Sequence, residues 1–306
     1  MELLRRDEVI YLCQFLDRET FEALSLVSSF FYRCTLYRKQ QRRVLLITRI
    51  HPLETFKLSF LRKMRWTSTS LKHLKHLNLG KFTPLLTNLT FGDHFNHPLD
   101  SLQFPPTLTH LTFGWSFNKP IEQLKFPLGL THLIFGRFFN QRVDRLEFAL
   151  SLTHLTFGLS FNQPVDKLPP SLTHLTFGVS FSQNCYRLAE LQNLTHLNVG
   201  KFFNLEDPTF FERLRFLTHL KFGPYFNRPV SHLRFPPNLT HLTFGVFFNH
   251  SVKDVQFPAS LTHLTFDYAF NRPLDQVPAS VTHLTLSHNY KLPPPTPRPG
   301  LTITFE

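Results

Sequence analysis

Ten of the 17 histidines occupy one position of a repeated phrase, where their imidazoles could bind a metal, exchange protons or recognise a partner. From His110 onward the members are 20 to 23 residues apart, and Asn88 takes the place once. Threonine follows two residues later in most copies. The histidine column consists of His76, His110, His132, His154, His174, His196, His219, His241, His263 and His283.

Three interpretations of the histidine column require different neighbours. A metal site needs further ligands, and no cysteine, aspartate or glutamate column stands beside the histidines. A recognition surface would use the ring edges and switchable donors of the imidazoles. A structural ladder needs only close packing between copies, and we favour it. The candidate partner face consists of His110, Thr112, His132, His154, Thr156, His174, Thr176, His241 and Thr243.

Stacking the histidine column has a consequence for its protonation. Neighbouring strands of a sheet lie about 4.8 Å apart, so protonated imidazoles in a row would repel one another. We therefore expect folded-state pKa values below the ordinary histidine value of about 6.5. The folded state should then lose stability as the pH falls through that range.

The chain carries no motif that would make it an enzyme. There is no glycine-rich phosphate loop, no H-E-x-x-H and no C-x-x-C. Aspartates recur after one turn of the repeat, but solvated turn residues or caps explain them better than general acids do. They are Asp100, Asp144, Asp166 and Asp275. We predict no catalysis, no cofactor and no bound metal.

The histidines belong to a phrase that returns about every 22 residues, and Leu108-Thr109-His110-Leu111-Thr112-Phe113 is its clearest copy. One such unit is too small to bury its own apolar face, so it must stack on its neighbours. The sustained period therefore predicts a solenoid. Its copies begin at Leu86, Leu108, Leu130, Leu152, Leu172, Leu194, Leu217, Leu239, Leu261, Val281 and Leu301.

Each unit divides into a strand, a turn and a return segment. In the strand the leucine and phenylalanine should point inward, while His110 and Thr112 point outward. Phe117-Asn118 and its equivalents form the turn, where stacked asparagine amides should build a ladder. Prolines of the return segment, such as Pro105-Pro106, exclude a helix there.

The phrase L-x-x-L-x-F…N is similar to the leucine-rich repeat, and its copies resemble the FNIP repeat, which is named for a Phe-Asn-x-Pro core. Phe117-Asn118-Lys119-Pro120 and Phe161-Asn162-Gln163-Pro164 match that core. Phe181-Ser182-Gln183-Asn184 and Phe203-Asn204-Leu205-Glu206 depart from it. The resemblance implies a right-handed solenoid with a parallel β-sheet on its concave face and an extended, non-helical convex side.

Residues 1–45 do not repeat, and their apolar side chains fall at helical spacing in two segments. These segments resemble the F-box, a helical motif that binds Skp-type adaptors of cullin ubiquitin ligases. Arg5 stands where the motif usually has proline, and Ser28 replaces a common cysteine. The resemblance implies that five apolar residues contact the adaptor, namely Leu4, Leu12, Leu16, Phe21 and Val27.

The predicted fold class is therefore α+β. We expect an F-box-like helical module over residues 1–45 and a linker with an N-terminal cap over residues 46–75. The FNIP repeat solenoid would occupy residues 76–292. A proline-rich loop and a closing strand would follow over residues 293–306.

Charge and cysteine content limit the partners and the compartment. A net charge of +12 permits nucleic acid or an acidic partner, but no lysine or arginine column follows the strands, which argues against nucleic acid. Three cysteines without metal-ligand spacing indicate a reducing compartment, the cytoplasm of the cell or of a host cell. No signal peptide and no membrane-spanning apolar run is visible.

An F-box followed by FNIP repeats is an arrangement seen in amoebae and in the giant viruses that infect them. The resemblance implies a substrate-recognition subunit that links a target protein to a Skp-type adaptor and a cullin ubiquitin ligase. The alternative is a standalone repeat scaffold for protein–protein interaction, in which the helical segment only caps the array.

Overall fold

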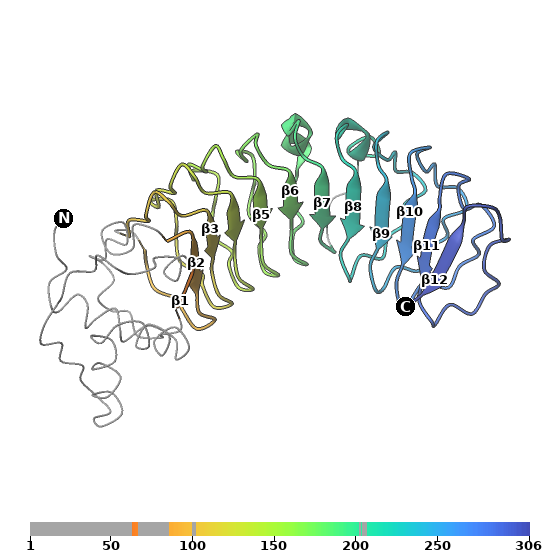
Figure 1. The fold of residues 1–306 in the computed structure, drawn as a ribbon, viewed down its shortest axis with the longest axis horizontal. Helices are drawn as coiled ribbons and strands as arrows, with labels where there is room; N and C mark the ends of the chain where they lie inside the picture. Colours follow the sequence, from red (N-terminus) through yellow and green to blue (C-terminus); the bar gives the residue numbers. More distant parts are fainter. Residues whose placement is uncertain (1–62, 67–85, 100–101, 202, 204–206) are drawn as a thin grey trace, which may run out of the picture.

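The computed structural model describes residues 63–66, 86–99, 102–201, 203 and 207–306, which form a curved array of stacked coils (Figure 1). The helical module predicted for residues 1–45 lies outside the described residues. Of the cap predicted over residues 46–75, only residues 63–66 are described.

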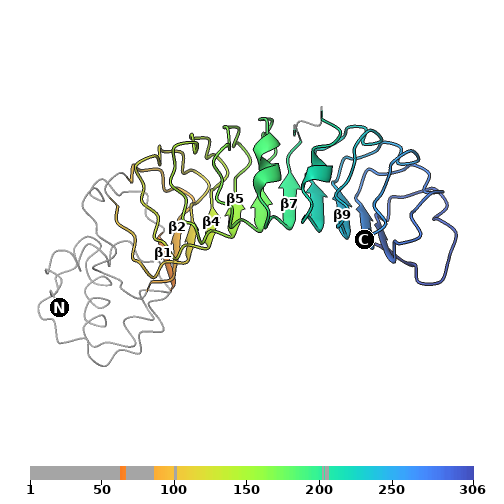
Figure 2. The ribbon, with the colours of Figure 1, turned by 90° about the horizontal axis from the view of Figure 1, so that it is seen from above.

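One short strand from each coil joins a single parallel sheet of 12 strands, in which every strand pairs with its neighbours in sequence. The sheet lies on the concave side of the array (Figure 2), so this part of the prediction is confirmed. The strands are β1 (Lys63–Trp66), β2 (Asn88–Phe91), β3 (His110–Thr112), β4 (His132–Ile134), β5 (His154–Thr156), β6 (His174–Thr176), β7 (His196–Val199), β8 (His219–Phe222), β9 (His241–Phe244), β10 (His263–Phe266), β11 (His283–Leu286) and β12 (Thr302–Phe305).

The register of the sheet places equivalent residues of successive coils side by side. His132 lies opposite His154, and the same holds at each pairing from β3 to β11. Backbone bonds outside the strands extend the match, since the N–H groups of Thr131 and His132 both donate to the carbonyl of Thr109 at 2.9 Å. The stacking that the repeat period predicts is thus confirmed.

The last copy begins one residue earlier than the sequence analysis placed it. Thr302 lies opposite His283, so Gly300 takes the first position of the copy and Leu301 the second. A shift of one residue exchanges the two faces of a strand. Here it sets Ile303 opposite Leu284 and continues the inward-facing apolar column. Gly300 has a φ of +83°, a conformation that glycine adopts without strain.

The first strand of the sheet comes from the predicted cap segment. β1 pairs directly with β2, and Lys63 lies opposite Asn88. In the sequence pattern, His76 is the member of the histidine column that precedes Asn88. His76 itself lies outside the described residues.

Two columns of phenylalanine fill the interior of the array. The rings of Phe113 and Phe135 stack with their centroids 5.5 Å apart, and those of Phe117 and Phe139 lie 6.1 Å apart. Within one coil, Phe113 and Phe117 stack at 4.3 Å. Complete burial of a side chain of this kind stabilises the fold by roughly 1.5–3 kcal/mol. The coils therefore hold together mainly through contacts with the coils above and below.

The asparagines after the turn phenylalanine form the predicted ladder. Asn118 Oδ1 accepts the backbone N–H of Asn140 at 3.0 Å, and Asn140 Oδ1 accepts that of Asn162 at 2.9 Å. Asn227 and Asn249 are linked in the same way at 3.1 Å. Each amide thus satisfies a main-chain donor that the short strands leave unpaired.

The convex side is extended in most coils but helical in two, so the prediction of a wholly non-helical convex side is wrong. A 3-10 helix, η3, spans Tyr186–Glu190, and a second, η4, spans Phe211–Arg213. The turns of both coils depart from the Phe-Asn-x-Pro core, but so does Phe139-Asn140-Gln141-Arg142, whose coil stays extended. Residues 185–191 contain no proline, so the backbone can form a helical turn there. Leu188 of this turn packs into the core.

Candidate interaction surface

Nine members of the histidine column are described, and their rings form one continuous stack on the concave face. Neighbouring centroids are 4.0–4.3 Å apart, with interplanar angles of 2–15°. The strand directs leucine into the core, and this orientation leaves the preceding histidine half-buried on the outer surface of the sheet. The stack runs from His110 on β3 to His283 on β11.

A threonine before each histidine fixes the orientation of the imidazole. Thr131 Oγ1 donates to the carbonyl of Thr109 at 3.1 Å and lies 2.8 Å from Nδ1 of His132. A hydroxyl has one hydrogen, and when the carbonyl receives it, Nδ1 carries the proton of the second bond. The remaining ring nitrogen, Nε2, is then an acceptor. The arrangement recurs at His110, His132, His154, His174, His196, His219, His241, His263 and His283.

Seven imidazoles of the stack, from His132 to His263, resist protonation. Desolvation is the main cause, and the positive charges that neighbouring imidazoles would carry are the second. Together they lower the pKa of His132, His196 and His241 to about 4. The pKa values of His154, His174, His219 and His263 are lowered for the same reasons. At neutral pH these side chains are therefore uncharged.

The geometry of the stack does not suit a shared metal ion. Because neighbouring rings are nearly parallel, their Nε2 lone pairs point side by side and do not converge on one point. Among the described residues there is also no group of three or more histidine, cysteine, aspartate or glutamate side chains that could hold a metal.

The outward face of the sheet is almost free of charge. In the two outward columns of β2 to β12, which contain the histidines and mostly threonine, no side chain is acidic, and Lys221 is the one basic residue. A hollow of about 240 Å³ lies over this face between β6 and β9 and is bordered by His174, His196, His219 and His241. The surface thus offers hydroxyls and imidazole nitrogens to a partner.

The predicted partner face maps to two parts of the sheet. The side chains from His110 to Thr176 lie on the adjacent strands β3 to β6 and form one patch. His241 and Thr243 lie on β9, separated from that patch by β7 and β8. The predicted adaptor contacts, Leu4, Leu12, Leu16, Phe21 and Val27, lie outside the described residues.

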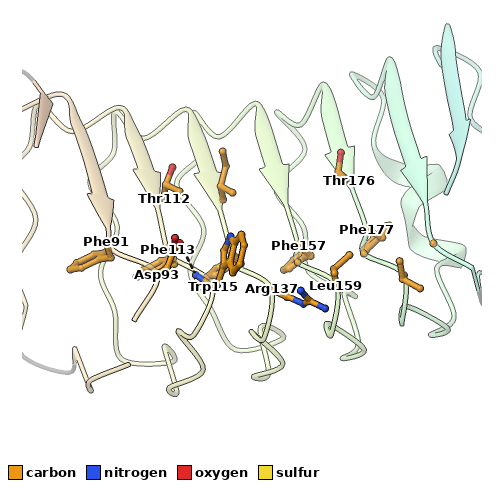
Figure 3. Close-up of a pocket in the computed structure, with 18 of the residues that line it drawn as sticks. Phe91, Asp93, Thr112, Phe113, Trp115, Arg137, Phe157, Leu159, Thr176 and Phe177 are labelled. Carbon is orange, nitrogen blue, oxygen red and sulfur yellow. Dashed lines mark hydrogen bonds between the residues drawn. The ribbon is translucent and has the colours of Figure 1, made fainter. Parts of the chain in front are cut away.

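A second surface, which the sequence analysis missed, follows the C-terminal ends of the strands (Figure 3). It is a groove of about 540 Å³ that crosses the coils from β2 to β8. Three of its apolar side chains are exposed to solvent, Trp115 by 59%, Leu159 by 43% and Ile134 by 40%. Neighbouring exposed apolar side chains of this size are characteristic of binding surfaces.

The groove exists because glycine follows the strand in coil after coil. A Cβ atom on Gly136 would lie 1.8 Å from the carbonyl oxygen of Gly114, and one on Gly158 would lie 1.9 Å from that of Gly136. Successive backbones therefore approach too closely for any side chain. The sequence contained a signal for this surface, since the glycines are followed by a variable residue that is often apolar, as in Gly114-Trp115 and Gly158-Leu159.

The recurring aspartates that the structure describes lie in turns. Asp144 accepts hydrogen bonds from Arg142 Nε at 3.0 Å and Nη2 at 2.6 Å, and this pairing lowers the pKa of its carboxyl group. A lowered pKa is opposite to what a general acid requires. Asp166 and Asp275 are exposed, and Asp100 lies outside the described residues.

The family of the chain follows from its repeats. A sequence profile of the FNIP repeat matches residues 73–116, 139–180, 215–247 and 248–289, which is more than half of the chain. The chain belongs to the FNIP repeat family. Three of the four matches span 42 to 44 residues, about two coils each. Within a coil, the Phe-Asn pair supplies a core ring and a rung of the asparagine ladder.

Several solved structures are similar to this FNIP repeat array. CroV588, described as a novel circular LRR protein, is 27% identical over 82% of this chain and 54% of its own, with a TM-score of 0.40. An internalin, InlF, from Listeria monocytogenes is 14% identical over 94% and 93%, with a TM-score of 0.48. A chain of the Toll–Spatzle complex of Drosophila is 15% identical over 76% and 31%, with a TM-score of 0.42.

The chain spans about half the length of the CroV588 chain that it matches. No curated protein matches it. Neither of the short helical turns in the described part of the chain approaches the length and hydropathy that a membrane-spanning helix needs.

Proposed function

We propose that this chain is the target-recognition subunit of a cullin-type ubiquitin ligase, in the cytoplasm of the cell or of a host cell. The helical segment at residues 1–45 would bind a Skp-type adaptor, and the FNIP repeats would hold the protein to be modified. Other subunits would transfer ubiquitin, so this chain itself needs no catalytic group. Its domains would be those expected from the sequence.

The observation that carries the recognition role is the pair of neighbouring surfaces on the array. The concave face offers neutral imidazoles and hydroxyls, and the groove beside it exposes Trp115, Ile134 and Leu159. An apolar centre next to a polar surface is the usual composition of a protein–protein interface. The adaptor role rests on the F-box resemblance of residues 1–45.

The first strand of the sheet favours this proposal over a standalone scaffold. β1 extends the sheet from residues 63–66 and pairs with β2. The edge of β2 is therefore paired with a segment that follows residue 45. We infer that residues 1–45 are not needed to pair with β2, a role that the cap of a standalone scaffold would have.

Co-purification with a Skp-type adaptor tests the adaptor role. The wild-type chain should retain the adaptor through size-exclusion chromatography. The double substitution Leu12→Ala and Leu16→Ala should abolish retention, because it removes two of the apolar anchors expected in a helix-in-groove contact. The substitution Phe138→Ala, at an exposed ring of the array, is the matched control and should leave retention unchanged.

Deleting residues 1–45 separates the two functions. If these residues are a docking module, the shortened chain should stay soluble and lose only the adaptor. If the shortened chain aggregates and the wild type binds no Skp-type adaptor, the scaffold alternative is correct.

A further inference from the structure

The groove at the C-terminal ends of the strands carries two charges in a defined order. Among its lining residues only Asp93 and Arg137 are charged. Asp93 follows β2, Trp115 follows β3, Arg137 follows β4 and Leu159 follows β5, so negative, apolar, positive and apolar side chains succeed one another along the array (Figure 3). This order constrains what can bind.

We propose that the groove binds an extended peptide segment of a partner protein, with two apolar side chains three residues apart and an acidic side chain between them. The proposal deepens the recognition role given above and rests on it. The apolar side chains contact Trp115 and Leu159, and the acidic side chain pairs with Arg137. A basic side chain beyond the first apolar residue faces Asp93.

The spacing follows from the geometry of the coils. Adjacent strands of a sheet lie about 4.8 Å apart, so two coils, from Trp115 to Leu159, span about 9.6 Å. A peptide in the extended polyproline II conformation repeats every three residues and rises about 3.1 Å per residue, so its residues i and i+3 lie on the same side about 9.3 Å apart. The groove crosses the coils, so a peptide that fills it lies along the array, perpendicular to the strands.

The shape and the exposure of the groove favour a peptide over a bulkier ligand. Its floor contains Gly114, Gly136 and Gly158, which carry no side chains, so a main chain can approach closely. Its volume of about 540 Å³ lies within the range of roughly 300–1,000 Å³ for ligand pockets. Trp115 is 59% exposed, and a bound apolar side chain would remove that surface from water.

The charge of Arg137 provides the sharpest test. Its guanidinium carbon lies 5.6 Å from the ring centroid of the exposed Phe138, beside the groove. None of the acidic side chains in the described part of the chain forms an ion pair with Arg137. The wild-type, full-length chain is used to select binders from a library of random linear peptides. The selected peptides should share two apolar residues three positions apart with an acidic residue between them.

Charge reversal at Arg137 should change what is selected. Arg137→Glu should weaken binding of the acidic peptides at least about tenfold, because like charges across an interface repel, and a new selection should favour a basic residue instead. Arg145→Glu, an equivalent reversal at an exposed arginine on the return segment of the same coil, should change neither result. Trp115→Ser and Leu159→Asp should each abolish binding.

Fluorescence gives an independent measure of occupancy. The chain has two tryptophans, and Trp66→Phe leaves Trp115 as the single reporter in the groove. Binding of a selected peptide should shift and saturate the Trp115 emission. The proposal is overturned if the selected peptides show no preference for an acidic residue. It is also overturned if Arg137→Glu and Trp115→Ser leave peptide binding unchanged. Because no adaptor takes part, failure here is distinct from failure of the ligase role.

Discussion

A Cβ atom placed on Gly136 would stand 1.8 Å from the carbonyl oxygen of Gly114, one coil below it. The spacing of the coils from β2 to β9 therefore depends on the glycines that follow the strands, whereas Asp267 and Ser287 hold that position after β10 and β11. No side-chain rearrangement can relieve such a contact, because a Cβ atom is fixed to its backbone and the oxygen that it meets belongs to the main chain.

We expect Gly136→Ala to destabilise the array by at least about 3 kcal/mol, since the coils must separate to admit the methyl group. Thermal unfolding followed by circular dichroism measures the effect. Gly129→Ala is the control, because a Cβ atom there meets nothing closer than Pro106 O at 3.6 Å. It should leave stability unchanged or raise it by about 0.4–1 kcal/mol. Equal effects of the two substitutions would contradict this account.

Removal of one rung should weaken the asparagine ladder. Asn140 Oδ1 accepts the backbone N–H of Asn162 at 2.9 Å and Nε2 of Gln163 at 3.1 Å. Asn140→Ala leaves the main-chain donor unpaired, and we expect a loss of about 1–3 kcal/mol in chemical denaturation. Gln163→Ala removes only the side-chain donor and should cost clearly less. A larger loss for Gln163→Ala would show that the ladder matters little.

Acid should destabilise the array through the histidine column. The folded-state pKa values of His132, His196 and His241 are lowered from 6.5 to about 4 by burial and by neighbouring imidazoles. Between these pH values the unfolded chain binds more protons, so stability is complete above pH 6.5 and is lost as the pH falls towards 4. We expect Tm to fall by roughly 5 °C or more between pH 7 and pH 5, at about 2–4 °C per kcal/mol.

A substitution within the column isolates this effect from the titration of carboxylates. Asn88 occupies the register position next to His110, so asparagine is compatible with the site. The double variant His196→Asn and His241→Asn should show a shallower dependence of Tm on pH than the wild type. An identical dependence would mean that the imidazoles are not responsible.

The threonine contacts predict a single tautomer for the stacked histidines. Because Thr131 Oγ1 donates to the carbonyl of Thr109, Nδ1 of His132 should carry the hydrogen at neutral pH. Nitrogen chemical shifts of the imidazole rings distinguish protonated from unprotonated nitrogen. The spectra should show protonated Nδ1 and unprotonated Nε2 throughout the stack. The opposite tautomer would mean that the threonine hydroxyl donates to the ring and gives up the carbonyl.

The sequence predicts most of the array because its signals are local and recur. The alternation of Leu111 and Phe113 with His110 and Thr112 determines which face of each strand is buried, and the period determines what stacks on what. The shift at Gly300 escaped prediction because two apolar residues, Leu301 and Ile303, both fit the pattern, and only the pairing with β11 decides between them.

The two 3-10 helices and the groove escaped prediction for different reasons. η3 and η4 themselves contain no proline, but that absence permits a helix without requiring one, because residues 140–151 also lack proline and stay extended. The groove depends on how closely Gly114 and Gly136 approach across coils, which no single copy of the repeat reveals. The apolar residues beside it, Trp115 and Leu159, differ from copy to copy and therefore stood outside the repeated pattern.

The number of residues per coil varies along this chain, whereas the spacing of the histidine rings on the concave surface stays constant. His154 and His174 are 20 residues apart and His196 and His219 are 23 apart, yet the ring centroids within each pair lie 4.1 and 4.0 Å from one another. The return segments on the outer side absorb every added or missing residue. Insertions and deletions in the return segments therefore leave the concave surface unchanged for a ligand. The convex side can diverge in sequence or accept engineered loops while recognition on the concave side stays constant.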